Sequence, residues 1–170
     1  MSTRRASSER PATDPEDFGA TASAEVAVDR PSRALYRYWR DPSNLPRVLE
    51  HVRSVTVLDG RRSRWVIAAP LGQTLEFDAE IVEDVAGRSI AWRSLEGGDA
   101  SIMGRVEFCD APSRRGCLVR ATIGFDPPGG ALGRLIAELL LKEPERQVGR
   151  DLRRFKRLME AQGTATDKPG

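Results

Sequence analysis

Few side chains in this sequence combine the type and the position that acid–base chemistry requires. General acid–base catalysis needs an ionisable group that reaches the substrate and has a pKa near the working pH. His51 is the one histidine of the chain, and it follows a predicted short helix and precedes a predicted strand. We interpret it as a junction residue bonded to backbone or water, because a histidine without a placed partner supports catalysis poorly. The alternative is an acid or base at the rim of a cavity.

Arg93 and Ser94 are the other candidates, and they occupy neighbouring positions of a predicted strand. Alternation along a strand places Ser94 on the same face as Trp92, where its hydroxyl could orient a ligand although it is a poor base. Arg93 is predicted to face the opposite way, unless a bulge turns it inward to hold a polar group. The inward face otherwise has no carboxylate, histidine or lysine, so we predict no catalytic constellation.

The cysteines also limit the chemistry. Cys109 and Cys117 are too few for a zinc site or a disulfide-stapled scaffold, so we expect no metal and no cofactor. If Val106 pairs with Val119, Cys109 points outward and Cys117 points inward. Both thiols are then predicted to be reduced, with Cys117 acting as a small buried hydrophobe.

The composition indicates one globular domain that has no strong overall electrostatic field. The chain has 170 residues, of which 39% are hydrophobic and 31% are charged, and its net charge is +2. This small charge does not favour a nucleic-acid partner. The chain shows no signal peptide, and its longest apolar run, 135–141, is too short to span a bilayer. We therefore expect a cytoplasmic protein, and the oligomeric state is left open.

The middle of the chain alternates apolar and polar residues with a period of two, which is typical of strands. Six strands are predicted at 52–58, 64–69, 74–84, 89–95, 101–108 and 117–125. An earlier strand at 23–29 is followed by two short helices that start near Pro31 and Pro42. The second is predicted to run to about Glu50 and to be short or broken, because Pro46 lies inside it. Short turns join the six strands, which indicates an antiparallel meander with one apolar face. The predicted fold class is α+β, with about seven strands and a C-terminal helix.

The C-terminal helix is predicted from an apolar stripe. Val148, Leu152, Phe155 and Met159 recur at the spacing of one helix face, and such a helix needs a partner surface to be stable. A preceding helix is predicted at 131–141. The basic residues of the opposite face are interpreted as solvated and paired with nearby acids rather than as a phosphate-binding patch.

Both ends of the chain are predicted to be disordered. Residues 1–21 and 162–170 are rich in small, polar and charged residues and bury too little apolar surface to offset the entropy of ordering. The folded body is thus predicted to span 22–161.

The order of the elements and several short motifs resemble the START-like, or SRPBCC, superfamily, which has the helix-grip fold. The motifs are Asp41-Pro42, Ile90-Ala91-Trp92-Arg93-Ser94, Gly104-x-Val106-x-Phe108, Phe125-Asp126-Pro127-Pro128-Gly129-Gly130 and Asp151-Leu152-x-x-Phe155-Lys156. The chain is most similar to the polyketide cyclase/dehydrase-like group, which is related to the coenzyme-Q-binding START proteins. The resemblance covers 22–161 and implies a sheet that curls around the last helix, with a cavity between them.

The resemblance implies that this cavity holds a small apolar molecule such as a lipid, a quinone or a polyketide. The residues predicted to bind it are Trp65, Phe77, Ile81, Trp92, Val106, Phe108, Ile123, Phe125, Leu152 and Phe155. Because the inward face lacks ionisable groups, we predict a carrier or a sensor. The first alternative is a polyketide cyclase/dehydrase-like enzyme that uses Arg93, Ser94 or His51. The second is a co-chaperone-like interaction module whose core is filled by side chains.

Overall fold

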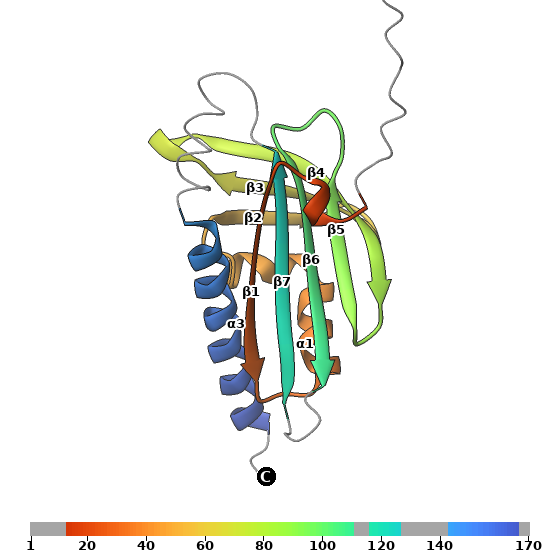
Figure 1. Ribbon diagram of the computed structural model, residues 1–170, viewed down its shortest axis with the longest axis vertical. Coiled ribbons are helices and arrows are strands. Elements are labelled where there is room, and N and C mark those ends of the chain that lie inside the picture. Colours follow the sequence, from red (N-terminus) through yellow and green to blue (C-terminus); the bar gives the residue numbers. More distant parts are fainter. Residues whose placement is uncertain (1–12, 111–115, 127–142, 167–170) are drawn as a thin grey trace, which may run out of the picture.

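The computed structural model describes residues 13–110, 116–126 and 143–166. The elements in chain order are η1 (Pro15–Asp17), β1 (Ala20–Val28), α1 (Ser32–Arg40), η2 (Pro42–Arg47), β2 (Val52–Val57), β3 (Arg62–Ala68), η3 (Pro70–Gly72), β4 (Thr74–Val85), β5 (Ser89–Ser94), β6 (Ser101–Asp110), β7 (Cys117–Asp126) and α3 (Pro144–Thr166), where η marks a 3-10 helix. The seven strands form one sheet in the order β1-β7-β6-β5-β4-β3-β2. This arrangement is the predicted α+β helix-grip fold (Figure 1).

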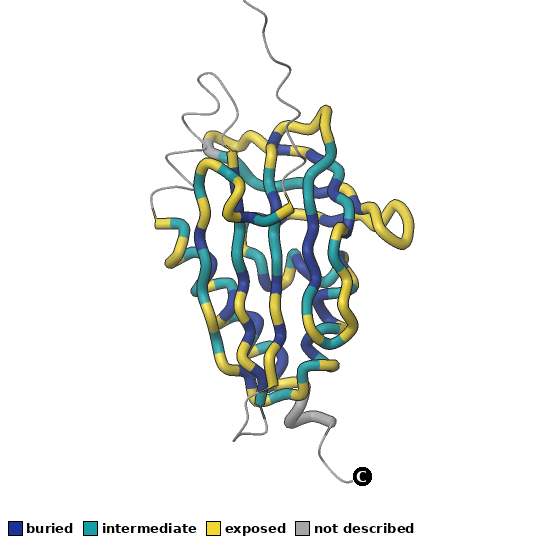
Figure 2. The backbone as a smooth tube through the Cα atoms, turned by 45° about the vertical axis from the view of Figure 1, so that its right-hand side comes forward, coloured by how far each residue is buried: buried dark blue, intermediate teal, exposed yellow. Residues whose placement is uncertain are grey.

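Every neighbouring pair of strands in the sheet is antiparallel. Strands β2 to β7 are neighbours in the chain as well as in the sheet, whereas β1 pairs with β7 from a distant part of the chain. The sheet is strongly twisted, so that β1, β7 and β6 follow the long axis in Figure 1 while β2 and β3 run across it. β4 shows the alternation most clearly, because Leu75, Phe77, Ala79 and Ile81 are all buried. Buried and exposed segments also alternate along the strands in Figure 2.

Helices α1 and α3 both pack on the concave face of the sheet. The predicted stripe of α3 is confirmed, since Val148, Leu152, Phe155 and Met159 are all buried. The ring of Phe155 is fully buried, with its centroid 5.7 Å from that of Tyr38 and 5.4 Å from that of Trp39 on α1. The two helices therefore contact each other through aromatic side chains as well as through the sheet.

The second predicted helix is short, as expected from Pro46 within it, and it ends before Glu50. Asp41 caps it, accepting a hydrogen bond of 3.1 Å from the backbone N–H of Ser43, but η2 is a 3-10 helix that ends at Arg47. Pro46 explains the difference, because its nitrogen carries no hydrogen to donate to the carbonyl of Pro42 in an α-helical turn.

The prediction of a disordered N-terminus is wrong over residues 13–21. Pro15 of η1 is buried on the outer face of the sheet, against Gly124 of β7. Arg105 of β6 donates a 2.6 Å hydrogen bond to Asp14 and also pairs with Glu83 at 3.1 Å. These contacts offset the cost of ordering a segment that has little apolar surface of its own.

The C-terminal end of the folded body differs from expectation, and one predicted helix cannot be compared with the structure. Helix α3 continues to Thr166, beyond the predicted end of the folded body at residue 161. The helix predicted at 131–141 lies outside the described residues. Among the residues that the structure describes, no helix is long and apolar enough to cross a membrane.

The pairing of β6 with β7 is displaced by two residues from the predicted one. Val106 lies opposite Ala121, and Phe108 lies opposite Val119. A shift by two keeps every side chain on its face. The expected placement of the thiols is therefore confirmed: Cys109 is exposed, Cys117 is buried, and both are free.

Candidate functional site

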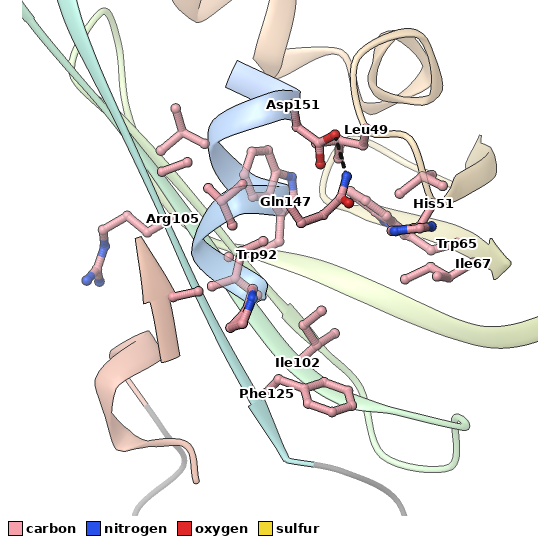
Figure 3. Close-up of a pocket in the computed structure, with 18 of the residues that line it drawn as sticks. Leu49, His51, Trp65, Ile67, Trp92, Ile102, Arg105, Phe125, Gln147 and Asp151 are labelled. Carbon is pink, nitrogen blue, oxygen red and sulfur yellow. Dashed lines mark hydrogen bonds between the residues drawn. The ribbon is translucent and has the colours of Figure 1, made fainter. Parts of the chain in front are cut away.

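An apolar cavity of about 200 Å³ lies between the concave face of the sheet and helices α1 and α3. All three tryptophans of the chain line it: Trp39 from α1, Trp65 from β3 and Trp92 from β5. Leu152 of α3 lines it on the side opposite the sheet. The cavity exists because the period-two faces of the strands and the helical stripe converge on the same space (Figure 3).

Most of the residues predicted from the sequence to bind a ligand are found at this cavity. Those that line it are Trp65, Phe77, Trp92, Val106, Ile123, Phe125 and Leu152. Ile81, Phe108 and Phe155 are buried in the surrounding core instead. Phe155 is excluded from the lining because the rings of Tyr38 and Trp39 pack against it. Phe108 packs against Tyr36 in a T-shaped arrangement, with 6.4 Å between the ring centroids.

Two of the three catalytic candidates also lie at the cavity. His51 lines it from the junction of η2 and β2, where its backbone carbonyl accepts a 2.8 Å hydrogen bond from Ala68. Ser94 lines it as well, and its hydroxyl oxygen accepts a 3.0 Å hydrogen bond from the backbone N–H of Ile102. Arg93 is not among the described residues that line the cavity, as strand alternation predicts.

Sequence reasoning missed Trp39 and, among the ionisable residues at the cavity, Asp151. Asp151 is one of the acids predicted to pair with basic residues on the solvated face of the last helix, yet it lines the cavity and its side chain is only 13% exposed. Burial raises the pKa of this carboxyl above its usual range, although its hydrogen-bond donors partly oppose the shift. A signal was present in the sequence, because Asp151 lies three residues after Val148 and immediately before Leu152. An apolar stripe at least about 100° wide includes that position at its edge.

Gln147 holds Asp151 in place. Its amide nitrogen donates to Asp151 Oδ1 and to Glu50 Oε2, both at 3.0 Å, and the first of these bonds is dashed in Figure 3. The bond to Gln147 is also the main reason why the pKa of Glu50 is lowered. The Gln147 amide oxygen accepts a bond of 3.3 Å from Arg150. The amide is thus fully engaged in orienting two carboxylates at the start of α3.

The three tryptophans that line the cavity differ in whether their buried indole N–H group has a hydrogen-bond partner. Trp65 Nε1 donates a 2.9 Å hydrogen bond to Ser63, which is itself 2% exposed. The indole nitrogens of Trp39 and Trp92 are buried and have no hydrogen-bond partner within the described part of the chain. A buried polar group without a partner costs roughly 1–3 kcal/mol. These two indole N–H groups could therefore each donate a hydrogen bond to a ligand in the cavity.

Comparison with known proteins agrees with the fold. A model of the family described as "Polyketide cyclase / dehydrase and lipid transport" matches residues 28–153. A 17.2-kDa uncharacterised protein of Streptomyces lincolnensis is 29% identical over 150 residues, which cover 85% of this chain and 91% of that protein.

Solved structures show the same architecture. DR_A0006 from Deinococcus radiodurans is 38% identical, with a TM-score of 0.65, over 81% of this chain and 95% of that one. An aromatase/cyclase of a Streptomyces species is 15% identical, with a TM-score of 0.63, over 84% of this chain and 92% of that one, and this likeness concerns the fold alone. Because the family model covers most of the chain and the described structure has the helix-grip fold, this chain belongs to the polyketide cyclase/dehydrase and lipid transport family within the START-like superfamily.

Proposed function

We propose that this protein binds a small, largely apolar molecule in the cavity between the sheet and α3, as a carrier or a sensor. The observation that supports this function most directly is an apolar cavity walled by Trp39, Trp65 and Trp92 within an otherwise packed core. Ligand sites are typically concave and apolar with a few polar groups. A side-chain-filled interaction module is disfavoured by the same cavity.

The size of the cavity bears on the ligand. Its volume of about 200 Å³ lies below the roughly 300–1,000 Å³ of sites for drug-sized ligands. We therefore expect a compact molecule of one or two rings, rather than a long-chain lipid enclosed along its whole length.

The test is saturable binding of naphthalene, an apolar molecule of two rings, followed by quenching of the fluorescence of the tryptophans that line the cavity. Ile123 lines the cavity, so Ile123→Phe reduces its volume and is expected to weaken binding at least about tenfold. Leu118 lies on the same strand but is 39% exposed, so Leu118→Phe is the matched control and is expected to bind like the unmodified protein. Absence of saturable binding, or equal loss in both variants, contradicts the proposal.

A second candidate function is a cyclase/dehydrase, and Asp151 is the observation that favours it. Cyclisation with loss of water needs one group that removes a proton and another that protonates an oxygen. Asp151 and His51 both line the cavity, and the charge of His51 acts on Asp151. A site with a buried, perturbed carboxyl and a second ionisable group meets the minimal requirement.

This second function is tested by exchange of the α-hydrogens of 2-tetralone, a small bicyclic ketone, in deuterium oxide. Catalysed exchange above the buffer rate that is lost in both Asp151→Asn and His51→Gln would support an enzyme. Exchange at the buffer rate with intact binding of naphthalene would leave the carrier or sensor function.

A further inference from the structure

Apart from the indole N–H groups of Trp39 and Trp92, which have no partner within the described residues and can only donate, the ionisable groups that line the cavity and could meet a ligand are concentrated at one end. The Ser94 hydroxyl oxygen accepts the Ile102 N–H, which leaves its hydrogen able to donate but gives the site no ionisable group. The side chain of Arg105 points away from the cavity in Figure 3, toward Asp14 and Glu83. His51 and Asp151 remain, on the side where α3 begins close to the η2–β2 junction.

The two oxygens of Asp151 have different surroundings. Oδ1 accepts hydrogen bonds from Gln147 at 3.0 Å, from the backbone N–H of Glu50 at 3.3 Å and from Arg154 at 3.4 Å. Oδ2 accepts none from the residues that the structure describes. A carboxyl held by one oxygen leaves the other oriented and available at a largely apolar site.

We infer that the ligand carries a neutral hydroxyl group, as a phenol or an alcohol does, and that Asp151 Oδ2 binds this hydroxyl at the α3 end of the cavity. This inference rests on the proposed binding function. Gln147 is the positioning residue, because it acts through Asp151 and its own amide is already engaged.

The chemistry of the site selects a hydroxyl over other groups. A hydroxyl donates to an ionised carboxylate and also accepts from a protonated carboxyl, so it fits Asp151 in either state. Burial raises the pKa of Asp151, so its carboxyl stays protonated up to a higher pH than an exposed aspartate does. A ligand carboxylate would be repelled by Asp151 and by Glu50, which share the donor Gln147. The apolar remainder of the ligand would then lie against the tryptophan wall.

The experiment compares naphthalene, 2-naphthol and 2-naphthoate, which share a ring system and differ in the polar group. Binding is measured by quenching of the fluorescence of the three tryptophans, all of which line the cavity. A hydrogen bond to a charged or buried partner corresponds to about tenfold in affinity. The intact protein is therefore expected to bind 2-naphthol about tenfold more tightly than naphthalene, and 2-naphthoate more weakly than 2-naphthol.

The variants separate this inference from the proposed function. Asp151→Leu is expected to bind naphthalene at least as tightly as the intact protein while losing the preference for 2-naphthol. Asp151→Asn, which keeps the shape and the contacts of Oδ1, is expected to retain part of the preference and provides the test if the leucine variant does not fold. Glu145→Leu is the matched control, because Glu145 is an exposed acid of α3 that does not line the cavity, and this variant is expected to keep the full preference.

The outcomes can be told apart. If naphthalene and 2-naphthol both fail to bind the intact protein, the proposed function fails. If naphthalene binds but 2-naphthol is not preferred, or the preference is undiminished in both Asp151 variants, the hydroxyl inference is overturned while the binding function stands.

Discussion

Gly124 of β7 lies directly against Pro15 of η1 on the outer face of the sheet. A Cβ atom on Gly124 would come within 2.7 Å of Pro15 Cα and closer still to its carbonyl oxygen. Real Cβ atoms do not approach backbone so closely, so only glycine allows η1 to pack here. On the neighbouring strand, Arg105 holds the same segment through Asp14 at 2.6 Å.

Gly124→Ala should therefore displace η1 and destabilise the domain. Overpacking of this kind costs about 1–3 kcal/mol of unfolding free energy, which urea denaturation followed by tryptophan fluorescence would measure. Gly104→Ala on β6 is the control, because its Cβ would meet Trp92 at an ordinary 3.7 Å. Equal losses in the two variants would mean that the contact with Pro15 is not what makes Gly124 necessary.

Phe155→Ala should destabilise the domain much more than an exposed substitution on the same helix. Phe155 is 0% exposed and contacts Tyr38 and Trp39, and removal of such a ring costs about 3–5 kcal/mol. Arg157→Ala, at an exposed position of α3, is expected to change the unfolding free energy by less than about 0.5 kcal/mol. A loss below about 1 kcal/mol for Phe155→Ala would be incompatible with the docking of α3.

Asp151→Asn should change how stability depends on pH. Burial raises the pKa of Asp151 in the folded state, whereas a carboxyl in an unfolded chain titrates near about 3.9. The contribution of Asp151 to stability is thus full below that pH and is lost as the pH rises through the folded pKa. The stability of the variant relative to the unmodified protein is therefore expected to be more favourable at pH 7 than at pH 4.

The charged groups that act on Asp151 must be held constant in this measurement. His51 faces Asp151 from the η2–β2 junction, and Arg154 contacts it from α3. The comparison is therefore repeated in a His51→Gln background, by thermal unfolding across the pH range. A stability difference that does not vary with pH in either background would show that Asp151 titrates alike in the folded and unfolded chains.

The two thiols should react at very different rates. Cys109 is exposed, whereas burial raises the pKa of the Cys117 thiol to about 11. Since the thiolate is the nucleophile, iodoacetamide at pH 8 is expected to label only Cys109 in the native protein. Mass spectrometry should find one adduct before unfolding and two after it, and rapid native labelling of Cys117 would argue against its burial in β7.

The architecture could be predicted from the sequence because it depends on local periodicity. The strand alternation from Val52 to Phe125 specifies which side chains share a face, and this remained correct even where the partner of Val106 was misplaced by two residues. Pairing register and the packing of residues 13–21 depend on contacts between distant segments. The sequence around Gly124 does not predict that the backbone of Pro15 lies against it.

The candidate site, too, could be predicted only in part from the sequence. The sequence by itself determined the apolar lining, because Trp65, Phe77 and Trp92 face inward by strand parity and Leu152 by helical spacing. Only the tertiary structure decided that Asp151, at the edge of that stripe, lines the cavity rather than meeting solvent. The reason is physical. Helical spacing gives the direction in which a side chain points around the helix axis, whereas its burial also depends on where η2 and β2 lie against α3. That placement encloses Asp151 beside Glu50 and raises its pKa.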